Sequence, residues 1–489
     1  MIRHKTINIV LAFVLACIQT ARAQVFVPTL PDSDGPHASM RYHVRVRPLA
    51  GGAWQGVPVL RCDVNTRRVQ QAAFAEWDMG EPVVVQIVNC NSVYSKTSLV
   101  VRPTSRGITP TMINDSTVQL ILQRPEYLSV EFDGDRQHNL HLFANASALS
   151  ITPDGDGLEQ WGITPLGDTE PRRIINWQGE QSQDVFVRNP NLIYFPPGVH
   201  KPKDLPGGDI RIPSNCTVYL APGAVVKARL IVDHAENVRI IGRGIVDHPL
   251  RGVDITHSRN VIVDGLTFLN PAHYTIFGGE STDITIRNIK TFSARSWSDG
   301  IDLMCCRRVH IENCFLRTSD DCIALYNHRW WYWGGSENIE VCRCILWPDV
   351  AHPVNIGSHG DDRNADGETL QRVHIHDCDI LGDDADGLGL LAINCGDNNH
   401  IRNIRFTRIR AEALRRSRPF DLRILQSPKY NRAPGCCIDS IAFEDIIIHP
   451  DVPDSCILPS RVEGMKEHPV GRYTLERVSH TTVVTATNK

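Results

Sequence analysis

The 489-residue chain lacks an excess of either charge, because 51 basic residues are balanced by 55 acidic ones, for a formal net charge of -4. Nucleic acid is usually recruited by a basic surface, so this balance argues against a nucleic-acid partner. Beyond its first residues the chain has no apolar run long enough for a permanent membrane span. It also lacks a glycine-rich phosphate loop and a metal-binding His/Cys cluster, so we expect no cofactor and no metal.

The first 23 residues have the pattern of a secretory signal peptide. Positive charge at residues 3–5 precedes an apolar run over 7–16, and Ala21-Arg22-Ala23 has the small-x-small form of a cleavage site. We therefore expect a secreted or periplasmic protein. Lipid attachment at Cys17 fits less well, because the Ala-x-Ala site downstream already explains cleavage.

Residues 24–160 predict an antiparallel β-sandwich domain. Short runs of alternating apolar residues are separated by turn residues, and no strong helix pattern interrupts them. The runs cover residues 42–46, 82–88, 117–122 and 127–132. Residues 161–189 are expected to link this domain to the next.

Residues 190–489 carry a repeated unit in which a polar residue is followed by alternating apolar and polar residues. Its start-to-start gaps are 20, 23, 23, 25, 30, 34, 31 and 37 residues. One short β segment per repeat, with no helix between repeats and no Leu-x-x-Leu-x-Leu pattern, predicts a right-handed parallel β-helix and an all-β chain. The units begin at Thr217, Asn237, Asn260, Asp283, Arg308, Asn338, Arg372, Asn403 and Ser440.

Three cysteines support this register. Cys314, Cys344 and Cys378 each fall six residues after the start of their repeat. Equivalent positions in successive coils stack about 4.8 Å apart, so we expect a buried ladder of small apolar side chains. A zinc site is the alternative, but no other spacing in the chain supports it.

Three aspartates carry the most chemical information. Asp299 and the pair Asp320-Asp321 precede two similar segments, Gly300–Leu303 and Cys322–Leu325, about one coil apart. Each acid alone also suits a turn. In register on a β-helix, however, they should lie side by side, where one carboxyl retains its proton and another activates water for glycosidic cleavage.

The segment resembles glycoside hydrolase family 28, the polygalacturonases. The resemblance rests on Trp297-Ser298-Asp299-Gly300-Ile301, Asp320-Asp321-Cys322-Ile323-Ala324, Ala351–Ser358 and Arg423-Ile424-Leu425. It implies an inverting hydrolase in which Asp320 is the general acid and Asp299 and Asp321 hold and activate water. The sandwich before the β-helix also resembles family 49, the dextranase group.

The same resemblance implies further site residues. His352 would tune the acid or contact the substrate, and Arg423 would bind the sugar. Leu425 replaces the family's lysine, which puts a plain galacturonan substrate in doubt, and Lys429 with its neighbour Tyr430 offers a replacement contact.

An aromatic stretch follows the aspartate pair and suggests a subsite wall, because aromatic faces pack on sugar rings. Within it we single out His328, Arg329, Trp330 and Trp331. The alternative is a loop that packs its own rings. Two other candidates, His359 and the pair His273-Tyr274, are more simply explained as surface and turn residues.

These patterns predict a glycoside hydrolase acting on a polysaccharide. A polysaccharide lyase on the same kind of fold remains an alternative, although lyases of this architecture usually need calcium and a basic residue. A non-catalytic carbohydrate-binding β-helix is the second alternative.

Overall fold

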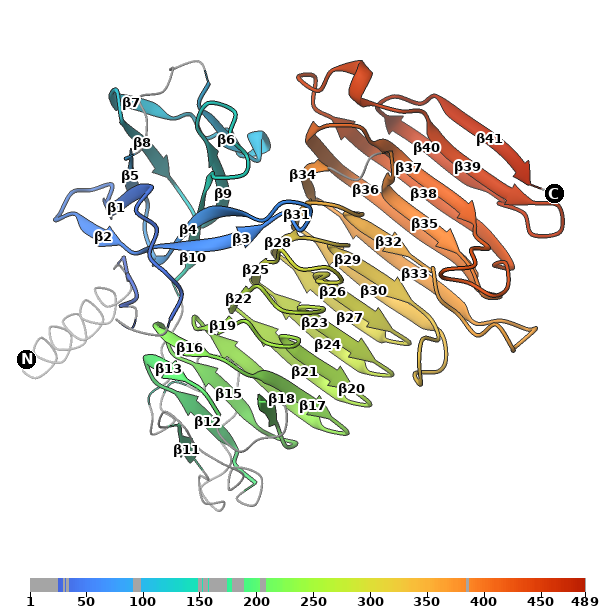
Figure 1. Cartoon of the computed structure of the whole chain (residues 1–489), viewed down its shortest axis with the longest axis horizontal. Helices are drawn as coiled ribbons and strands as arrows, with labels where there is room; N and C mark the ends of the chain where they lie inside the picture. The colour runs from blue at the N-terminus through green and yellow to red at the C-terminus, as the bar shows by residue number, and fades with distance from the viewer. Residues whose placement is uncertain are drawn as a thin grey trace, which may run out of the picture. The chain divides into compact units, whose positions relative to one another are not determined.

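The computed structural model describes residues 25–29, 31, 35–90, 98–147, 152, 157, 174–177, 189–202, 208–383 and 387–488. The predicted signal peptide, and most of the predicted linker, lie outside these residues. The chain folds into two compact units. One contains Pro36–Arg61 and Ala72–Leu149, and the other contains Cys62–Gln71 and Ser150–Lys489 (Figure 1).

The first unit contains two five-stranded sheets, ordered β2-β1-β5-β8-β7 and β3-β4-β10-β9-β6. Neighbouring strands run antiparallel in the first sheet, and in the second β9 pairs antiparallel with β6 and β10, whereas β4 and β10 are parallel. Trp77, Leu120 and Leu128 are among the fully buried side chains of its core. The strands are β1 (Tyr42–Pro48), β2 (Gln55–Val57), β3 (Val59–Val64), β4 (Gln70–Met79), β5 (Val83–Asn89), β6 (Val100–Arg102), β7 (Thr111–Asn114), β8 (Thr117–Leu122), β9 (Glu126–Glu131) and β10 (Leu140–Ala146).

The second unit is the predicted right-handed parallel β-helix, in which each strand pairs in parallel with its equivalent one coil later. An eleven-stranded sheet along one face carries the candidate site described below. Its strands are β14 (Asp209–Arg211), β17 (Arg229–Asp233), β20 (Val253–Thr256), β23 (Ile276–Gly279), β26 (Ile301–Met304), β29 (Ile323–Tyr326), β32 (Val354–Ile356), β35 (Gly389–Cys395), β37 (Arg418–Ile424), β39 (Ser460–Met465) and β41 (Val483–Asn488).

A twenty-stranded sheet forms the remaining faces of the coils. Its strands are β11 (Ile174–Asn176), β12 (Leu192–Phe195), β13 (Gly198–His200), β15 (Thr217–Leu220), β16 (Ala224–Val226), β18 (Glu236–Gly242), β19 (Ile245–Asp247), β21 (Arg259–Asp264), β22 (Thr267–Leu269), β24 (Thr282–Arg287), β25 (Lys290–Phe292), β27 (Arg307–Glu312), β28 (Phe315–Thr318), β30 (Ser336–Cys342), β31 (Ile345–Pro348), β33 (Thr369–His376), β34 (Asp379–Asp383), β36 (His400–Leu414), β38 (Cys437–Ile448) and β40 (Tyr473–Val478). The helices assigned in the described residues are short 3-10 turns, Thr104–Arg106 and Asp454–Cys456, and none of them could cross a membrane.

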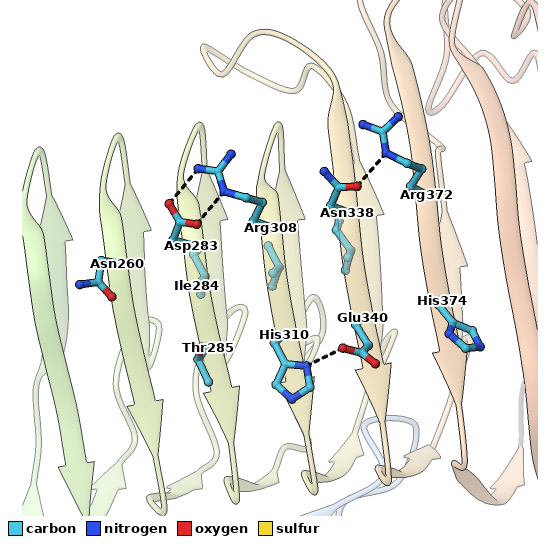
Figure 2. Close-up of a pocket in the computed structure, with 12 residues that line it drawn as sticks. Asn260, Asp283, Ile284, Thr285, Arg308, His310, Asn338, Glu340, Arg372 and His374 are labelled. Carbon is cyan, nitrogen blue, oxygen red and sulfur yellow. Dashed lines mark hydrogen bonds and ion pairs between the residues drawn. The ribbon is translucent and has the colours of Figure 1, made fainter. Parts of the chain in front are cut away.

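The polar residue that opens most repeats has a left-handed backbone. Its φ is 57° at Asn237, 54° at Asn260 and 58° at Asp283, and it is also positive at Arg308 and Arg372. Asn and Asp tolerate this conformation because their short side chains bond locally. Here the side chains also bond between coils, as Arg308 does to Asp283 (2.6 Å) and Arg372 to Asn338 (2.7 Å), forming a polar row along the outer face (Figure 2).

Inward-facing side chains of successive coils stack into one core that includes Val263, Ile286 and Ile311, all fully buried. Cys314, Cys344 and Cys378 are part of this core and are buried free thiols. Burial raises the pKa of the Cys344 thiol well above its ordinary value. A neutral, buried thiol fills space as a small apolar group, in keeping with the predicted ladder.

Candidate active site

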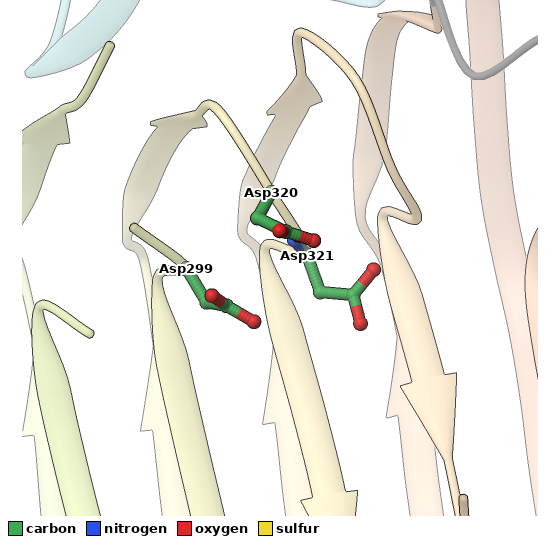
Figure 3. A group of neighbouring side chains, drawn as sticks. All are labelled: Asp299, Asp320 and Asp321. Carbon is green, nitrogen blue, oxygen red and sulfur yellow. The ribbon is translucent and has the colours of Figure 1, made fainter. Parts of the chain in front are cut away.

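Three aspartates meet at the start of two neighbouring strands of the eleven-stranded sheet (Figure 3). Asp299 lies two residues before β26 and Asp321 two residues before β29, and these strands pair in register, Ile301 opposite Ile323. One carboxylate oxygen from each of Asp299, Asp320 and Asp321 lies within 4.8 Å of the others. The parallel register therefore brings together acids that are about one coil apart in the sequence.

A glycine allows this close approach. The Gly300 amide donates to the Asp321 carbonyl at 2.9 Å. A Cβ at Gly300 would lie 2.3 Å from the Cys322 carbonyl oxygen, well inside van der Waals contact. Any side chain at this position would force the two coils apart, and with them the two acids.

Asp321 is the carboxylate that the protein keeps ionised. Its Oδ1 accepts hydrogen bonds from the His352 backbone amide (2.8 Å) and lies 2.7 Å from the His352 Nδ1, and its Oδ2 accepts from Asn355 (2.8 Å). Burial alone would raise the pKa of Asp321, but the His352 charge and these hydrogen bonds lower it below the ordinary value. Asp321 is thus available to accept a proton.

Asp320 has the opposite environment. Burial, together with the neighbouring Asp321 charge, raises the pKa of Asp320 to about 6. Its Oδ1 accepts the Asp321 amide at 3.1 Å. Burial also raises the pKa of Asp299 well above its ordinary value, and the nearby acids Asp302 and Asp320 add to the effect. Two adjacent carboxyls with pKa values pushed apart are suited to act as acid and base.

Asp302 is a fourth acid, which the sequence analysis treated only as part of a strand. It is fully buried in β26, and burial raises its pKa although the Arg329 charge opposes the shift. The register places it on the outward row with Ala324 and Asn355, on the same face as the trio. Period-two alternation within Gly300–Leu303 was the signal that could have identified it.

A cleft of about 560 Å³ opens beside the trio. Of the predicted contacts, His352, Arg423, Arg329 and Tyr430 line it, as does Leu425. Arg423 forms an ion pair with Glu463 one coil further on (Nε to Oε2, 2.9 Å). This ion pair holds Arg423 in place at the cleft.

Lys429 lies beside rings that line the cleft, whereas most of the aromatic stretch does not line it. The Lys429 ammonium sits 5.6 Å from the Trp297 ring centroid and 4.5 Å from that of Tyr430, two rings at the cleft. His328 is buried and stacks on Trp333 at 3.7 Å. Neither His328 nor Trp330 and Trp331 is among the cleft-lining residues described.

His359 and Tyr274 both line the cleft, although the sequence favoured a surface and a turn position for them. His359 is half-buried and lines the cleft with Tyr326, whose ring is 5.0 Å away in an edge-to-face contact. Burial lowers the pKa of His359 to about 3, so it is neutral. Tyr274 also lines the cleft and is almost fully buried, so it is more than a turn residue. A single loop histidine offers no periodic pattern that would predict its position in the cleft.

Residues 229–422 match the family model of Glycosyl hydrolases family 28, which confirms the resemblance predicted from the motifs. A polygalacturonase from Chamaecyparis obtusa is 33% identical over 126 residues, 25% of this chain and 22% of the relative. An exopolygalacturonase from Arabidopsis thaliana is 28% identical over 163 residues, 33% of this chain and 36% of the relative. The chain thus spans only about a fifth to a third of the length of these relatives.

The fold likeness is more extensive than the sequence likeness. The structure of Dex49A from Penicillium minioluteum superimposes with a TM-score of 0.52 and 14% identity, over 89% of this chain and 90% of the other. At that identity the likeness concerns the fold alone. It covers most of both units, in keeping with the predicted family 49 likeness of the sandwich.

Proposed function

We propose that this protein is a secreted glycoside hydrolase that cleaves a polysaccharide by carboxylate acid/base catalysis. The observation that carries the proposal is the trio itself. Three carboxylates lie within 4.8 Å of one another, and their environments raise the pKa of Asp320 to about 6 while lowering that of Asp321. The segment that matches family 28 contains all three.

The residues take the following roles. Protonated Asp320 donates its proton to the glycosidic oxygen as the bond to the anomeric carbon breaks. A water molecule held by Asp299 and Asp321 attacks that carbon, and ionised Asp321 accepts the water's proton. His352 acts through Asp321, because its hydrogen bonds hold that carboxylate ionised and in place. Arg423 and Tyr430 contact the sugar.

Inversion at the anomeric carbon rests on the family resemblance. Inverting glycosidases usually separate their carboxyls by about 6.5–9.5 Å, and retaining ones by about 5–5.5 Å. The nearest oxygens of the trio are closer than either, within 4.8 Å, so carboxyl separation does not support inversion here. The anomeric configuration of the first product, observed by NMR before mutarotation, decides between the two outcomes.

The residues that line the cleft limit which sugars it can bind. Leu425, where the family has lysine, cannot pair with a uronate carboxylate, whereas the Lys429 ammonium lies beside the cleft rings Trp297 and Tyr430. A screen for new reducing ends over galacturonan, rhamnogalacturonan and dextran tests the function and identifies the glycan. Reducing ends without ultraviolet absorbance from a new double bond support hydrolysis, whereas absorbance would indicate a lyase. No product from any glycan, or full activity in Asp320→Asn, contradicts the proposal.

A further inference from the structure

The cleft beside the aspartates is closed on one side by a segment that we call the strap, residues 327–335, which connects β29 to β30. The strap folds back on itself, since Arg329 and Tyr332 exchange backbone hydrogen bonds of 3.2 and 3.1 Å. From the end of β29 it extends over β26 and β23, the strands of the preceding coils. It therefore lies on the N-terminal side of the trio.

The strap also contacts the edge of the sheet at which the aspartates lie. Arg329 lies three residues after the end of β29, and its Nη1 donates to the Tyr274 hydroxyl at 2.7 Å. Tyr274 is the register equivalent of Asp299 one coil earlier, because Ile276 pairs with Ile301. This hydrogen bond therefore ties the strap to the coil that precedes Asp299, one strand spacing of about 4.8 Å away.

The surface under the strap is buried. Phe277, Asp302 and Met304 are on outward-facing rows of β23 and β26, where an open groove would expose them. Instead all three are buried, with exposed fractions of 1%, 0% and 0%. The Tyr332 ring packs against Phe277, with 5.4 Å between the ring centroids, and would be 2.5 Å from a Cβ at Gly279. No sugar chain can run across this face while the strap is in place.

The strap is anchored at both ends. The Glu368 carboxylate accepts the His328 amide at one end and the Gly334 amide at the other, both at 2.7 Å. Glu280 accepts the Trp333 amide at 2.5 Å. Hydrogen bonds to a charged acceptor are roughly twice as strong as neutral ones, so the strap is a fixed wall of the cleft.

On the other side of the trio the cleft continues. Asn394, Asp421 and Arg423 line it, and they come from β35 and β37, the coils that follow the aspartates. A chain bound with a glycosidic bond at Asp320 can thus continue past these coils, but it must end at the strap.

We infer that the cleft admits the end of a glycan chain and that the enzyme removes short units from that end. This inference rests on the proposed function and specifies its substrate as chain termini. The three aspartates lie outside the strap, so we expect the trio to act on internal bonds if Tyr332 and its end of the strap were displaced. Tyr332 against Gly279 is the contact through which displacement can be tested.

The experiment follows viscosity and reducing ends together, on the glycan identified by the screen. The wild type should release short products of one narrow size class from the first time points, while viscosity stays close to its starting value. Early products of random size with a steep loss of viscosity would overturn the inference and leave the proposed hydrolase intact. No reducing ends from any glycan would instead overturn the hydrolase itself.

Gly279→Ala supplies the matched perturbation, because the new methyl group would meet the Tyr332 ring at 2.5 Å. Displacing the strap should increase the share of long early products and steepen the loss of viscosity. The control is Gly56→Ala, in strand β2, where an added Cβ meets nothing within 4 Å. An unchanged product pattern in folded Gly279→Ala, with Tyr332 shown to have moved by a crystal structure, would overturn the inference. If Gly279→Ala does not fold, the wild-type measurement alone decides.

Discussion

Asp320→Asn should make the protein more stable at neutral pH while it abolishes turnover. The pKa of Asp320 is raised to about 6 by burial and by the Asp321 charge. A raised folded-state pKa means that the native protein binds this proton more tightly than the unfolded chain does. The stability supplied by the proton is complete below the unfolded value of 3.8 and is lost as pH rises through 6. At pH 7 the folded protein therefore holds an unfavourable charge.

The size of the effect follows from the same two values. The interval between 3.8 and 6 corresponds to about 3 kcal/mol, at about 1.4 kcal/mol per pKa unit. Asparagine cannot ionise, and its side-chain oxygen can still accept the Asp321 amide that now bonds to Oδ1 at 3.1 Å. The free energy of unfolding at pH 7 should thus rise by up to about 3 kcal/mol, with the gain shrinking to nothing near pH 4.

Asp321→Asn is the matched control, with the opposite sign. The pKa of Asp321 is lowered by His352 against the effect of burial, so its charge stabilises the fold above pH 3.8 and that contribution is lost as pH falls below it. An amide nitrogen there would face the His352 and Asn355 donors, which costs about 1–3 kcal/mol. Urea unfolding at pH 4 and pH 7 measures both variants. If both lose similar stability at pH 7, the assignment of acid and base environments is refuted.

Four further predictions concern the cleft and the core. The kcat/KM of the wild type should fall as pH rises through about 6, because Asp320 must be protonated. His352→Ala should move the acidic limb of the kcat/KM profile to higher pH, because it removes the partner that lowers the pKa of Asp321. Leu425→Lys should lower the KM for galacturonan and not for dextran in a steady-state assay, because an ammonium at the cleft can pair with a uronate. Cys344→Ser should lower the free energy of unfolding, measured in urea, by about 1–3 kcal/mol, because a hydroxyl replaces a thiol in an apolar core. The wild type should release no zinc when it unfolds, and stoichiometric zinc would contradict the cysteine ladder.

Most of the fold was predictable because a β-helix repeats one short pattern. Alternation in each unit fixes which side chains face inward, and the polar residue that opens the unit adopts a left-handed backbone in coil after coil, as at Asn237 and Asn260. Stacking of Cys314, Cys344 and Cys378 in the core follows from the same register. The parallel pairing of β4 with β10 inside the sandwich was not foreseen, because strand order in a sheet depends on contacts distant in sequence.

The candidate site likewise has residues that the repeat predicts and residues that it does not. The meeting of Asp299 with Asp321 follows from two strands one coil apart, so the sequence was sufficient to place them together. The position of His359 in the cleft and that of the aromatic stretch depend on how long insertions fold back, and no periodic pattern governs these. Trp331 is an exposed ring on the strap, with 67% of its surface accessible, and its contact with sugar stays a prediction.

Chemistry and specificity therefore depend on different parts of this chain. The acid trio is set by coil register, which any insertion between strands leaves unchanged. The extent of the cleft is set by the strap, inserted after β29, and its lining by residues 425–430, which follow β37. Because these loops connect strands that are already paired in the β-helix, they can be exchanged without disturbing the register of Asp299 and Asp321. A different residue in the lining, such as Leu425 where the family resemblance implies lysine, then requires no change in the arrangement of the three acids.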